Sequence, residues 1–432
     1  MNRRVVVTGL GVISSLGNTV KENWKNLTEG ISGISPLALL PSPSFPVKTA
    51  GGIKHFKPAD HGIQPKSLKV MNTTIQYAIA ASNFAVEDAN ISRNEYADRE
   101  IGLSFGVNGI QYAAEEGFLA LYEAINKDLR NYMSGDNMTA GAPIKINDPG
   151  LAVHPLWPLS VLANMSLCHI AIHHNFQGPN LAFSSIDAAG SQAIGEAYRS
   201  ILQGMGDIYV AGGGYALNTI DILSLSSMDM LSKKQEAVRP FDRLRDGCVP
   251  GEGAAVLIIE EMSHALKRGA PIYAEIAGYG SFFNGLSDAC DNGNSSTDCQ
   301  AMQECMSRAL SDASLDPASI DYINADGKGT VQSDRLEAQA LHHMFGREVP
   351  VSTSKPLTGH MLAANGAFQA LSTVLSIKHG IIPPTINCLD QDPQCDIAVV
   401  KNALKKQIKY AISNTFGFSG EHTSLVFKHY NQ

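Results

Sequence analysis

Hydrophobic residues in the first part of the chain fall into short β-branched runs that are separated by longer segments with helical spacing. The short runs are typical of buried strands, and they occupy residues 3–9, 101–106, 180–185, 207–213 and 254–261. The longer segments, 73–89 and 191–205, carry apolar positions with the period of an α-helix. This alternation predicts an α/β protein with largely parallel sheets.

The second part of the chain repeats the same rhythm. Its strand-like runs lie at 272–281, 320–326, 348–354 and 410–418, and its helical segments lie at 299–313 and 367–380. No literal sequence repeat accompanies the rhythm, so the pattern alone indicates an internal duplication. We expect one half at 1–260, with insertions in 107–160, and a second half at 261–432.

Composition narrows the class of protein and its partners. The chain has 432 residues, of which 44% are hydrophobic, so it can bury a core large enough for two domains or one duplicated domain. Its formal net charge of −8 and its lack of a basic run argue against nucleic acid as a partner. No apolar stretch reaches the roughly 18 residues that a bilayer span needs, and the first apolar run is short and β-branched, unlike a signal peptide. We expect a cytoplasmic protein that contacts no membrane.

The cysteines match neither a disulfide framework nor a zinc site. Their number is odd, their spacing is irregular, and no CxxC pair occurs. The sequence therefore predicts free thiols and no metal. The seven are Cys168, Cys248, Cys290, Cys299, Cys305, Cys388 and Cys395.

A glycine-rich stretch near the N-terminus, VVVTGLGVISSLG, invites comparison with a dinucleotide-binding loop. Its glycines are Gly9, Gly11 and Gly17, so the third glycine of a GxGxxG motif is missing. No acidic residue closes a neighbouring strand at the distance that such a site requires. We interpret the stretch as a glycine turn after a strand, and we expect no cofactor.

Several polar loops beside strands are candidates for chemistry. In SSIDAAGSQAIGEAYRS, a strand runs through an Ala/Gly-rich turn into a helix, which is a common mount for a nucleophile, yet the turn carries Asp187. The loop 324–341 presents Asp326, and the loop 352–371 presents Lys355 and His360, although a lone histidine is more often structural than catalytic. Glu252, just before a buried strand, is expected to be partly buried and to need a partner.

Six motifs in order resemble the β-ketoacyl-acyl-carrier-protein synthases, the type II fatty-acid and polyketide ketosynthases of the thiolase fold. They are RRVVVTGLGVISSLG, SSIDAAGSQAIGEA, RPFDRLRDGCVPGEGAA, NADGKGT with a following D..E, KPLTGHMLAANGA and NTFGFSGEHTSLVF. The resemblance covers essentially the whole chain. It implies an α/β, thiolase-like fold: two duplicated βαβαβαββ halves in a five-layered αβαβα arrangement.

The resemblance also implies a set of site residues. The family's nucleophilic cysteine falls on Asp187, its first histidine on Asp326 and the threonine after it on Lys328, whereas its lysine and second histidine are kept as Lys355 and His360. The usual glycine-rich segment after the gating phenylalanine is altered and contains His422. The implied positions of the acyl tunnel and its gate are Phe416, Phe418, Asn108 and Ile110.

These departures predict a site that does not condense acyl chains. A carboxylate is a poor nucleophile toward a thioester, and Asp326 places negative charge where an enolate would need hydrogen-bond donors. A single lost cysteine could be a knock-out of an ordinary synthase, but the additional changes argue for a site rebuilt as a polar cluster. We expect Lys355 within ion-pair reach of Asp187 or Asp326, and the helix N-terminus stabilising the charge of Asp187.

Three functions remain open. The first is a chain-length factor, which would pair with an active ketosynthase subunit as a heterodimer and meet acyl carrier protein through that complex; Asp187 departs from the glutamine that is most frequent there. Segment 106–124 would then supply tunnel and interface residues, or be an ordinary helix. The second is a carrier-bound thioester hydrolase or malonyl decarboxylase that uses Asp187 as a base with His360. The third is a homodimeric scaffold that binds carrier protein.

Overall fold

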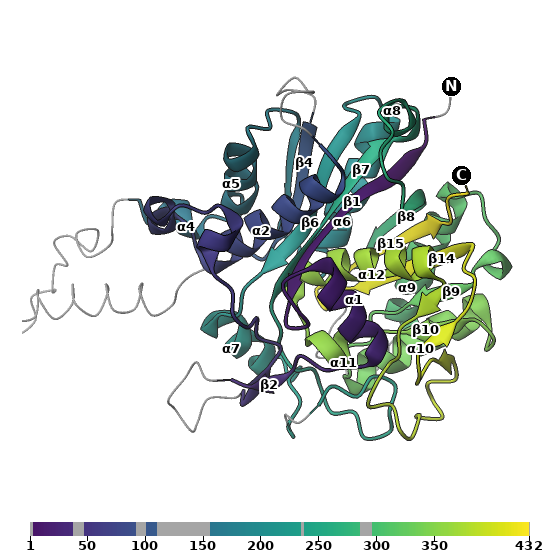
Figure 1. Ribbon diagram of the computed structural model, residues 1–432. Helices are drawn as coiled ribbons and strands as arrows, with labels where there is room; N and C mark the ends of the chain where they lie inside the picture. Colours follow the sequence, from purple (N-terminus) through teal and green to yellow (C-terminus); the bar gives the residue numbers. More distant parts are fainter. Residues whose placement is uncertain are drawn as a thin grey trace, which may run out of the picture.

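The computed structural model describes residues 3–37, 47–91, 101–109, 156–234, 237–285 and 296–431. Its main feature is one eleven-stranded sheet in the order β12-β10-β9-β14-β15-β8-β1-β7-β6-β4-β5 (Figure 1). The strands of the first half are β1 (Val5–Ser14), β4 (Ile101–Val107), β5 (Asn180–Phe183), β6 (Ile208–Tyr215) and β7 (Gly253–Glu261). Those of the second are β8 (Ala274–Phe283), β9 (Tyr322–Asn324), β10 (Pro350–Ser352), β12 (Ala398–Val399), β14 (Tyr410–Phe416) and β15 (Glu421–Lys428).

The same strand order occurs twice in this sheet. The first half runs β5-β4-β6-β7-β1 and the second runs β10-β9-β14-β15-β8, each with two parallel pairings followed by two antiparallel ones. The halves join where residues 5–7 of β1 pair antiparallel with 274–276 of β8. The expected rhythm of a duplication is thus visible in the topology.

The sheet is mixed, so the prediction of largely parallel sheets is wrong for its centre. From β14 to β6, every neighbouring pair is antiparallel. Strands buried on both faces show continuous apolar runs whatever their direction, so the hydrophobic pattern alone cannot distinguish the two senses.

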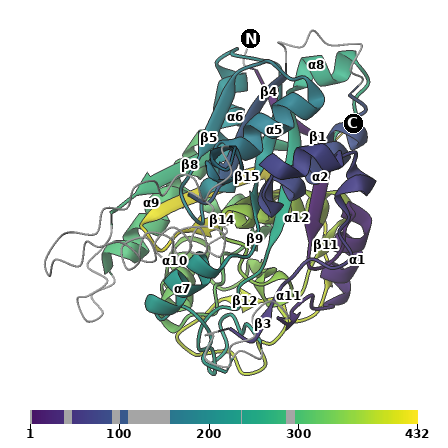
Figure 2. The ribbon, with the colours of Figure 1, turned by 90° about the vertical axis from the view of Figure 1, so that its left-hand side faces the viewer.

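Helices cover both faces of the sheet and fill the space between the halves (Figures 1 and 2). Helix α2 (Thr73–Asp88) packs on β1, β7 and β6 and on α5 (Met165–His174), while α9 (Ser296–Asp312) packs on β8 and β15 and on α10 (Val331–Phe345). Between the halves lie α6 (Ala189–Leu202) and α12 (Asn365–His379), which touch each other and strands of both halves. The result is a five-layered arrangement with α6 and α12 in the middle.

Alternation along β7 shows why both of its faces are covered. Ala255, Leu257 and Ile259 belong to the core that contains α6 and α12 residues. Ala254, Val256 and Ile258 belong to the separate core under α2 and α5. Successive side chains of a strand point to opposite faces, so this apolar run requires a helical layer on each side.

The remaining elements are short. The α-helices are α1 (Val20–Glu29), α4 (Pro158–Val161), α7 (Thr219–Ser227), α8 (Met262–Lys267) and α11 (Lys355–Thr358). The two-residue strands are β2 (Ser35–Pro36), β3 (Thr49–Ala50), β11 (Ile381–Ile382) and β13 (Leu404–Lys405), and the 3₁₀ turns are η1 (Pro58–His61), η2 (Pro65–Val70), η4 (Pro317–Ser319) and η5 (Leu362–Ala364).

Gly9 and Gly11 lie inside β1, so the interpretation of a glycine turn after a short strand is wrong. The strand continues to Ser14, and α2 crosses it closely at both glycines. A Cβ on Gly9 would lie 2.3 Å from the carbonyl oxygen of Ala85, and one on Gly11 would lie 1.9 Å from that of Ala81. These glycines therefore allow a helix to approach the strand; they form no phosphate-binding loop.

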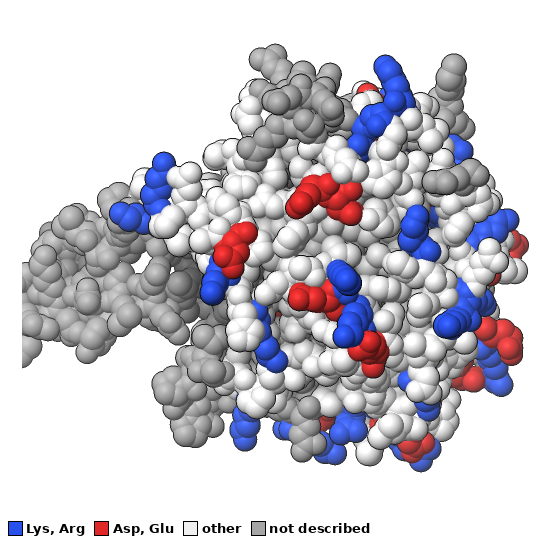
Figure 3. All heavy atoms as spheres, viewed as in Figure 1, with Lys and Arg blue, Asp and Glu red and all other residues white. Residues whose placement is uncertain are grey.

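Strand β5 was expected to be buried, but the structure shows that it is not. It forms an edge of the sheet, and its residues alternate between exposed and half-buried. On the face shown in Figure 3, acidic and basic side chains are interspersed, with no large area of one sign. Within the described residues, no helix is long and apolar enough to cross a membrane.

Candidate active site

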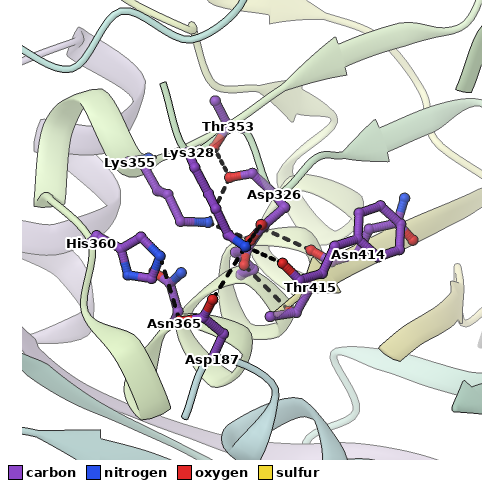
Figure 4. A network of polar contacts seen from close by, with 12 residues as sticks. Asp187, Asp326, Lys328, Thr353, Lys355, His360, Asn365, Asn414 and Thr415 are labelled. Carbon is purple, nitrogen blue, oxygen red and sulfur yellow. Dashed lines mark hydrogen bonds and ion pairs between the residues drawn. The ribbon is translucent and has the colours of Figure 1, made fainter. Parts of the chain in front are cut away.

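Four segments that each follow a strand meet at one buried cluster (Figure 4). Asp187 follows β5 in the turn before α6, and Asp326 and Lys328 follow β9. Lys355 begins α11 just after β10, and the turn with Phe418 follows β14. The carboxyl ends of the parallel neighbours β14, β9 and β10 share one edge of the sheet, so the fold brings their loops together. Asp187 follows β5 at the other end of the sheet and reaches the cluster through the start of α6, which packs on α12 and η5. The structure thus assembles the predicted site.

Two lysines and two aspartates form the centre of the cluster. The Nζ atom of Lys355 lies 2.5 Å from Oδ1 of Asp326, as expected. The Nζ atom of Lys328 lies 3.4 Å from Oδ2 of Asp326 and 3.2 Å from Oδ2 of Asp187. None of these four side chains is more than 3% exposed. The partner of Asp187 is thus Lys328, a residue whose pairing the sequence did not predict.

The loop that carries Asp326 is fixed by further hydrogen bonds. The backbone carbonyl oxygen of Asp326 accepts hydrogen bonds from Nζ of Lys355 at 2.6 Å and from Oγ1 of Thr353 at 3.0 Å. The backbone amides of Asp326 and Gly327 donate to the carboxylate of Glu337 at 2.7 and 2.8 Å. Buried ions are tolerated where they are both paired and hydrogen-bonded. Asp326 meets that condition.

Asp187, unlike Asp326, is not both paired and hydrogen-bonded. Neither of its carboxylate oxygens accepts a hydrogen bond from any described residue. Burial raises the pKa of Asp187 to about 7, against the lowering effect of Lys328. No described amide at the N-terminus of α6 donates a hydrogen bond to this carboxylate, and its nearest cation is Lys328.

The two aspartates differ because of their cations. Burial alone would raise the pKa of Asp326, but Lys355 and Lys328 together hold it below its ordinary value. For Lys328, burial opposes the charge, yet Asp326 and Asp187 raise its pKa above the ordinary value. At neutral pH the cluster therefore contains a charged Lys328 and Asp326 beside an Asp187 that is near its titration point.

His360 is neutral, and its Nε2 atom has no hydrogen-bond partner among the described residues. Its Nδ1 atom accepts a hydrogen bond from the amide of Leu362 at 3.2 Å, so the proton of the neutral ring is on Nε2. Nε2 faces Oδ1 of Asp187 at 3.5 Å. Burial, with Lys355 and Lys328, lowers the pKa of His360 well below its ordinary value. This ring is not free to take up a second proton near neutral pH.

The loop after β14 closes over Lys328. The ring of Phe418 lies 4.4 Å from Nζ of Lys328, which also donates a hydrogen bond to the carbonyl of Phe416. His422 is buried, and neither of its ring nitrogens has a hydrogen-bond partner among the described residues; burial lowers its pKa to about 4. Asn108 is buried at the end of β4, whereas Ile110 and nearly all of segment 106–124 lie outside the described residues.

Two further residues belong to this neighbourhood. Glu337 was visible only as the final letter of a motif, and its role in holding the loop of Asp326 needed the structure. Cys248, which the sequence placed away from the elbow, lies within electrostatic reach of Asp187; burial, and then Asp187, raise the pKa of its thiol to about 12. Such a thiol stays protonated and is a weak nucleophile.

Glu252, which was expected to be partly buried and to need a partner, lies outside the cluster. It is buried and accepts hydrogen bonds from the amides of Ile53 and Leu217 and from the hydroxyl of Tyr77. Burial raises its pKa, and these hydrogen bonds oppose the increase. Among the residues that the structure describes, no group of three His, Cys, Asp or Glu side chains could hold a metal ion.

Comparisons with known proteins agree with this architecture. The family "Beta-ketoacyl synthase, N-terminal domain" matches residues 2–265, and "Beta-ketoacyl synthase, C-terminal domain" matches residues 273–389. A relative from Staphylococcus aureus (strain COL), "3-oxoacyl-[acyl-carrier-protein] synthase 2", is 35% identical; the match covers 99% of this chain and 98% of the relative.

Solved structures are similar over the whole chain. "The ishigamide ketosynthase/chain length factor" matches with a TM-score of 0.86 and 29% identity, covering 100% of both chains. A type II polyketide synthase acyl-carrier protein in complex with its ketosynthase matches with a TM-score of 0.79 and 29% identity, also covering 100% of both chains. The fold is the thiolase-like ketosynthase fold predicted from the sequence, and the chain belongs to the β-ketoacyl synthase family.

Proposed function

We propose that this chain is a non-condensing ketosynthase homologue that acts as a chain-length factor, paired with an active ketosynthase in type II polyketide or specialised fatty-acid synthesis. One observation carries the proposal: the buried Lys328 ammonium pairs with both Asp187 and Asp326, where the family resemblance places a nucleophile and a hydrogen-bond donor. At these positions a carboxylate replaces the thiolate that would accept an acyl chain, and a second carboxylate stands where an enolate would need a hydrogen-bond donor.

Two similar structures support the assignment of partners. One is a ketosynthase/chain length factor, and the other is an acyl-carrier protein in complex with its ketosynthase. We infer an active ketosynthase as the partner subunit and acyl carrier protein as a partner of the complex. Phe416, Phe418 and Asn108 are proposed as tunnel and gate residues. Phe416 and Phe418 both contact Lys328, and Asn108 is buried just after β4.

Co-expression tests this function. The chain is produced alone and together with the ketosynthase encoded beside it, and each product is examined by size-exclusion chromatography and assayed with malonyl- and acyl-carrier protein. We expect a stoichiometric complex that condenses, and no condensation by this chain alone. Condensation by the isolated chain would refute the proposal. A homodimer that binds carrier protein without turnover and ignores the ketosynthase would instead identify a scaffold.

A hydrolase or decarboxylase is the second candidate, because burial raises the pKa of Asp187 to about 7, where a carboxyl group can serve as a general base. Two contacts argue against it: Lys328 engages one oxygen of Asp187, and the Nδ1 lone pair of His360 is already used by Leu362. Release of free acid or carbon dioxide from carrier-bound substrate, abolished by Asp187→Asn, would favour this candidate.

A further inference from the structure

Lys328 has more partners than charge neutralisation requires. Its ammonium contacts the carboxylates of Asp187 and Asp326, donates to the backbone carbonyl of Phe416, and faces the ring of Phe418 at 4.4 Å. The first two partners lie on the turn before α6 and on the loop after β9, and the last two lie at the end of β14 and on the loop that follows it. One buried cation thus connects three separate segments.

The loop after β14 is itself a tight turn. The amide of Gly417 donates to the carbonyl of Glu421 at 2.6 Å, and Gly420 adopts a positive φ of 88°. A turn closed in this way moves as a unit with its strands' ends. Phe418 can therefore leave its place only if the loop moves or the ring turns away, and either change separates it from Lys328.

The ring of Phe418 also lies beside the ring of His360, with 5.7 Å between their centroids. The aromatic ring thus covers the side of the cluster where Lys328 and His360 approach Asp187. Cation–π contacts are strongest when the cation is removed from water, and Lys328 is almost completely buried.

We propose that Lys328 is a positioning residue that holds Phe418 and its loop closed over Asp187, so that the cluster is sealed from acyl groups and reagents. This inference goes beyond the proposed function and does not require the partner subunit. A chain that failed to form the heterodimer could still be sealed, and a heterodimer could form with an unsealed subunit.

Cys248 offers a built-in reporter of the seal. It is 1% exposed, and its neighbours in sequence connect it to the cluster: the amide of Gly247 donates to Gly329, and the carbonyl of Val249 accepts from His360. Lys328 lowers the pKa of the Cys248 thiol, so loss of the ammonium alone would decrease its thiolate fraction. Faster alkylation after that loss would therefore report exposure rather than activation.

The experiment compares Lys328→Met, which keeps the stem but removes the charge, with Lys328→Arg, which keeps a cation. Alkylation of Cys248 by iodoacetamide is followed by peptide mass spectrometry, and hydrogen exchange is measured for residues 416–421. The control is Lys409→Met, which removes an exposed lysine whose Nζ lies 5.2 Å from the ring of Tyr410. We expect alkylation about tenfold faster, or more, in Lys328→Met, with Lys328→Arg restoring protection and the control unchanged.

Phe418→Leu keeps the complete ion cluster and tests the seal without leaving Asp187 unpaired. It should also increase Cys248 alkylation, with circular dichroism like that of the parent chain. Unchanged alkylation and exchange in a folded Phe418→Leu chain would overturn the inference. So would a failure of Lys328→Arg to restore protection that Lys328→Met has lost.

Discussion

Two carboxylates of the chain, Glu260 and Asp187, are both fully buried but are stabilised in opposite ways. Glu260 accepts two hydrogen bonds from Arg268, both at 2.7 Å, one from Thr8 at 2.9 Å, and contacts Nδ1 of His264 at 2.6 Å. Asp187 accepts none from the described residues and has only ion contacts at 3.2 and 3.5 Å. A buried carboxylate with a full set of hydrogen bonds is typical of a residue that stabilises the fold. One that lacks hydrogen bonds is typical of a functional site.

The largest effect is expected at Glu260. Arg268→Met should lower the free energy of unfolding by about 3–5 kcal/mol, because it leaves a buried carboxylate without its cation. Urea unfolding measures the change. Arg308→Met removes an arginine from an exposed pair with Glu304 and should cost less than about 1 kcal/mol. Equal losses in the two variants would show that Glu260 is not the structural carboxylate that its contacts indicate.

A smaller loss of stability is expected at the other carboxylate. Lys328→Met should cost about 2–3 kcal/mol in urea unfolding, because buried pairs are costly to break but Asp187 can then take up a proton. Asp187→Asn in the same chain should recover part of that loss. If the double variant is no more stable than Lys328→Met, then the charge of Asp187 is not what Lys328 stabilises, and the comparison with Glu260 fails.

The titration of Asp187 predicts a pH dependence of stability. Its pKa of about 7 in the folded chain lies above the ordinary value of 3.8, so between these values the folded chain holds a proton that the unfolded chain has released. Its contribution to stability is complete below about pH 4, falls as the pH rises toward 7, and is constant above. Relative to Asp187→Asn, the parent chain should lose on the order of 2–4 kcal/mol across this range. Parallel thermal-denaturation profiles would contradict the assignment.

The smallest expected effect concerns His360, whose ring should not titrate near neutral pH. Burial and the two nearby lysines keep the pKa of His360 well below its ordinary value, so its ring should stay neutral from pH 5.5 to 8, a range around the ordinary value of ~6.5. Proton NMR of the histidine Hε1 resonances, assigned with His360→Gln, measures this directly. A resonance of His360 that shifts with a midpoint near 6.5 would show that neither burial nor the two lysines lowers the pKa of this ring.

Much of the site could be predicted from the sequence because it lies on motifs whose order and spacing are local. The positions of Asp187, Asp326, Lys355 and His360 followed from strand-to-loop patterns. The cost of an unpaired buried acid predicted that Lys355 would pair with one of the two aspartates, and the structure shows that it pairs with Asp326. The pairing of Lys328 with Asp187 did not, because it joins residues 141 positions apart (328 − 187) and depends on the direction of one flexible side chain.

The fold shows the same division. The duplication was visible in the rhythm of strands and helices, whereas the antiparallel centre of the sheet was not, because burial on both faces hides strand direction. In the sequence, Gly9 and Gly11 resemble a turn. In the structure, glycine is needed at both positions because α2, some seventy residues further along the chain, crosses the strand closely there. Contacts of that kind leave no local pattern.

The duplicated architecture gives the cluster a consequence for assembly of the chain. Asp187 belongs to the first half, whereas Asp326, Lys328, Lys355 and His360 all belong to the second. The first half alone would bury Asp187 away from its cation, because Lys328 lies in the second half, where it also faces Asp326 and Glu421. Packing of the halves through α6 and α12 brings Asp187 to Lys328. The ion pair between Asp187 and Lys328 thus favours packing of one half on the other, because each charge would be costly to bury without its partner.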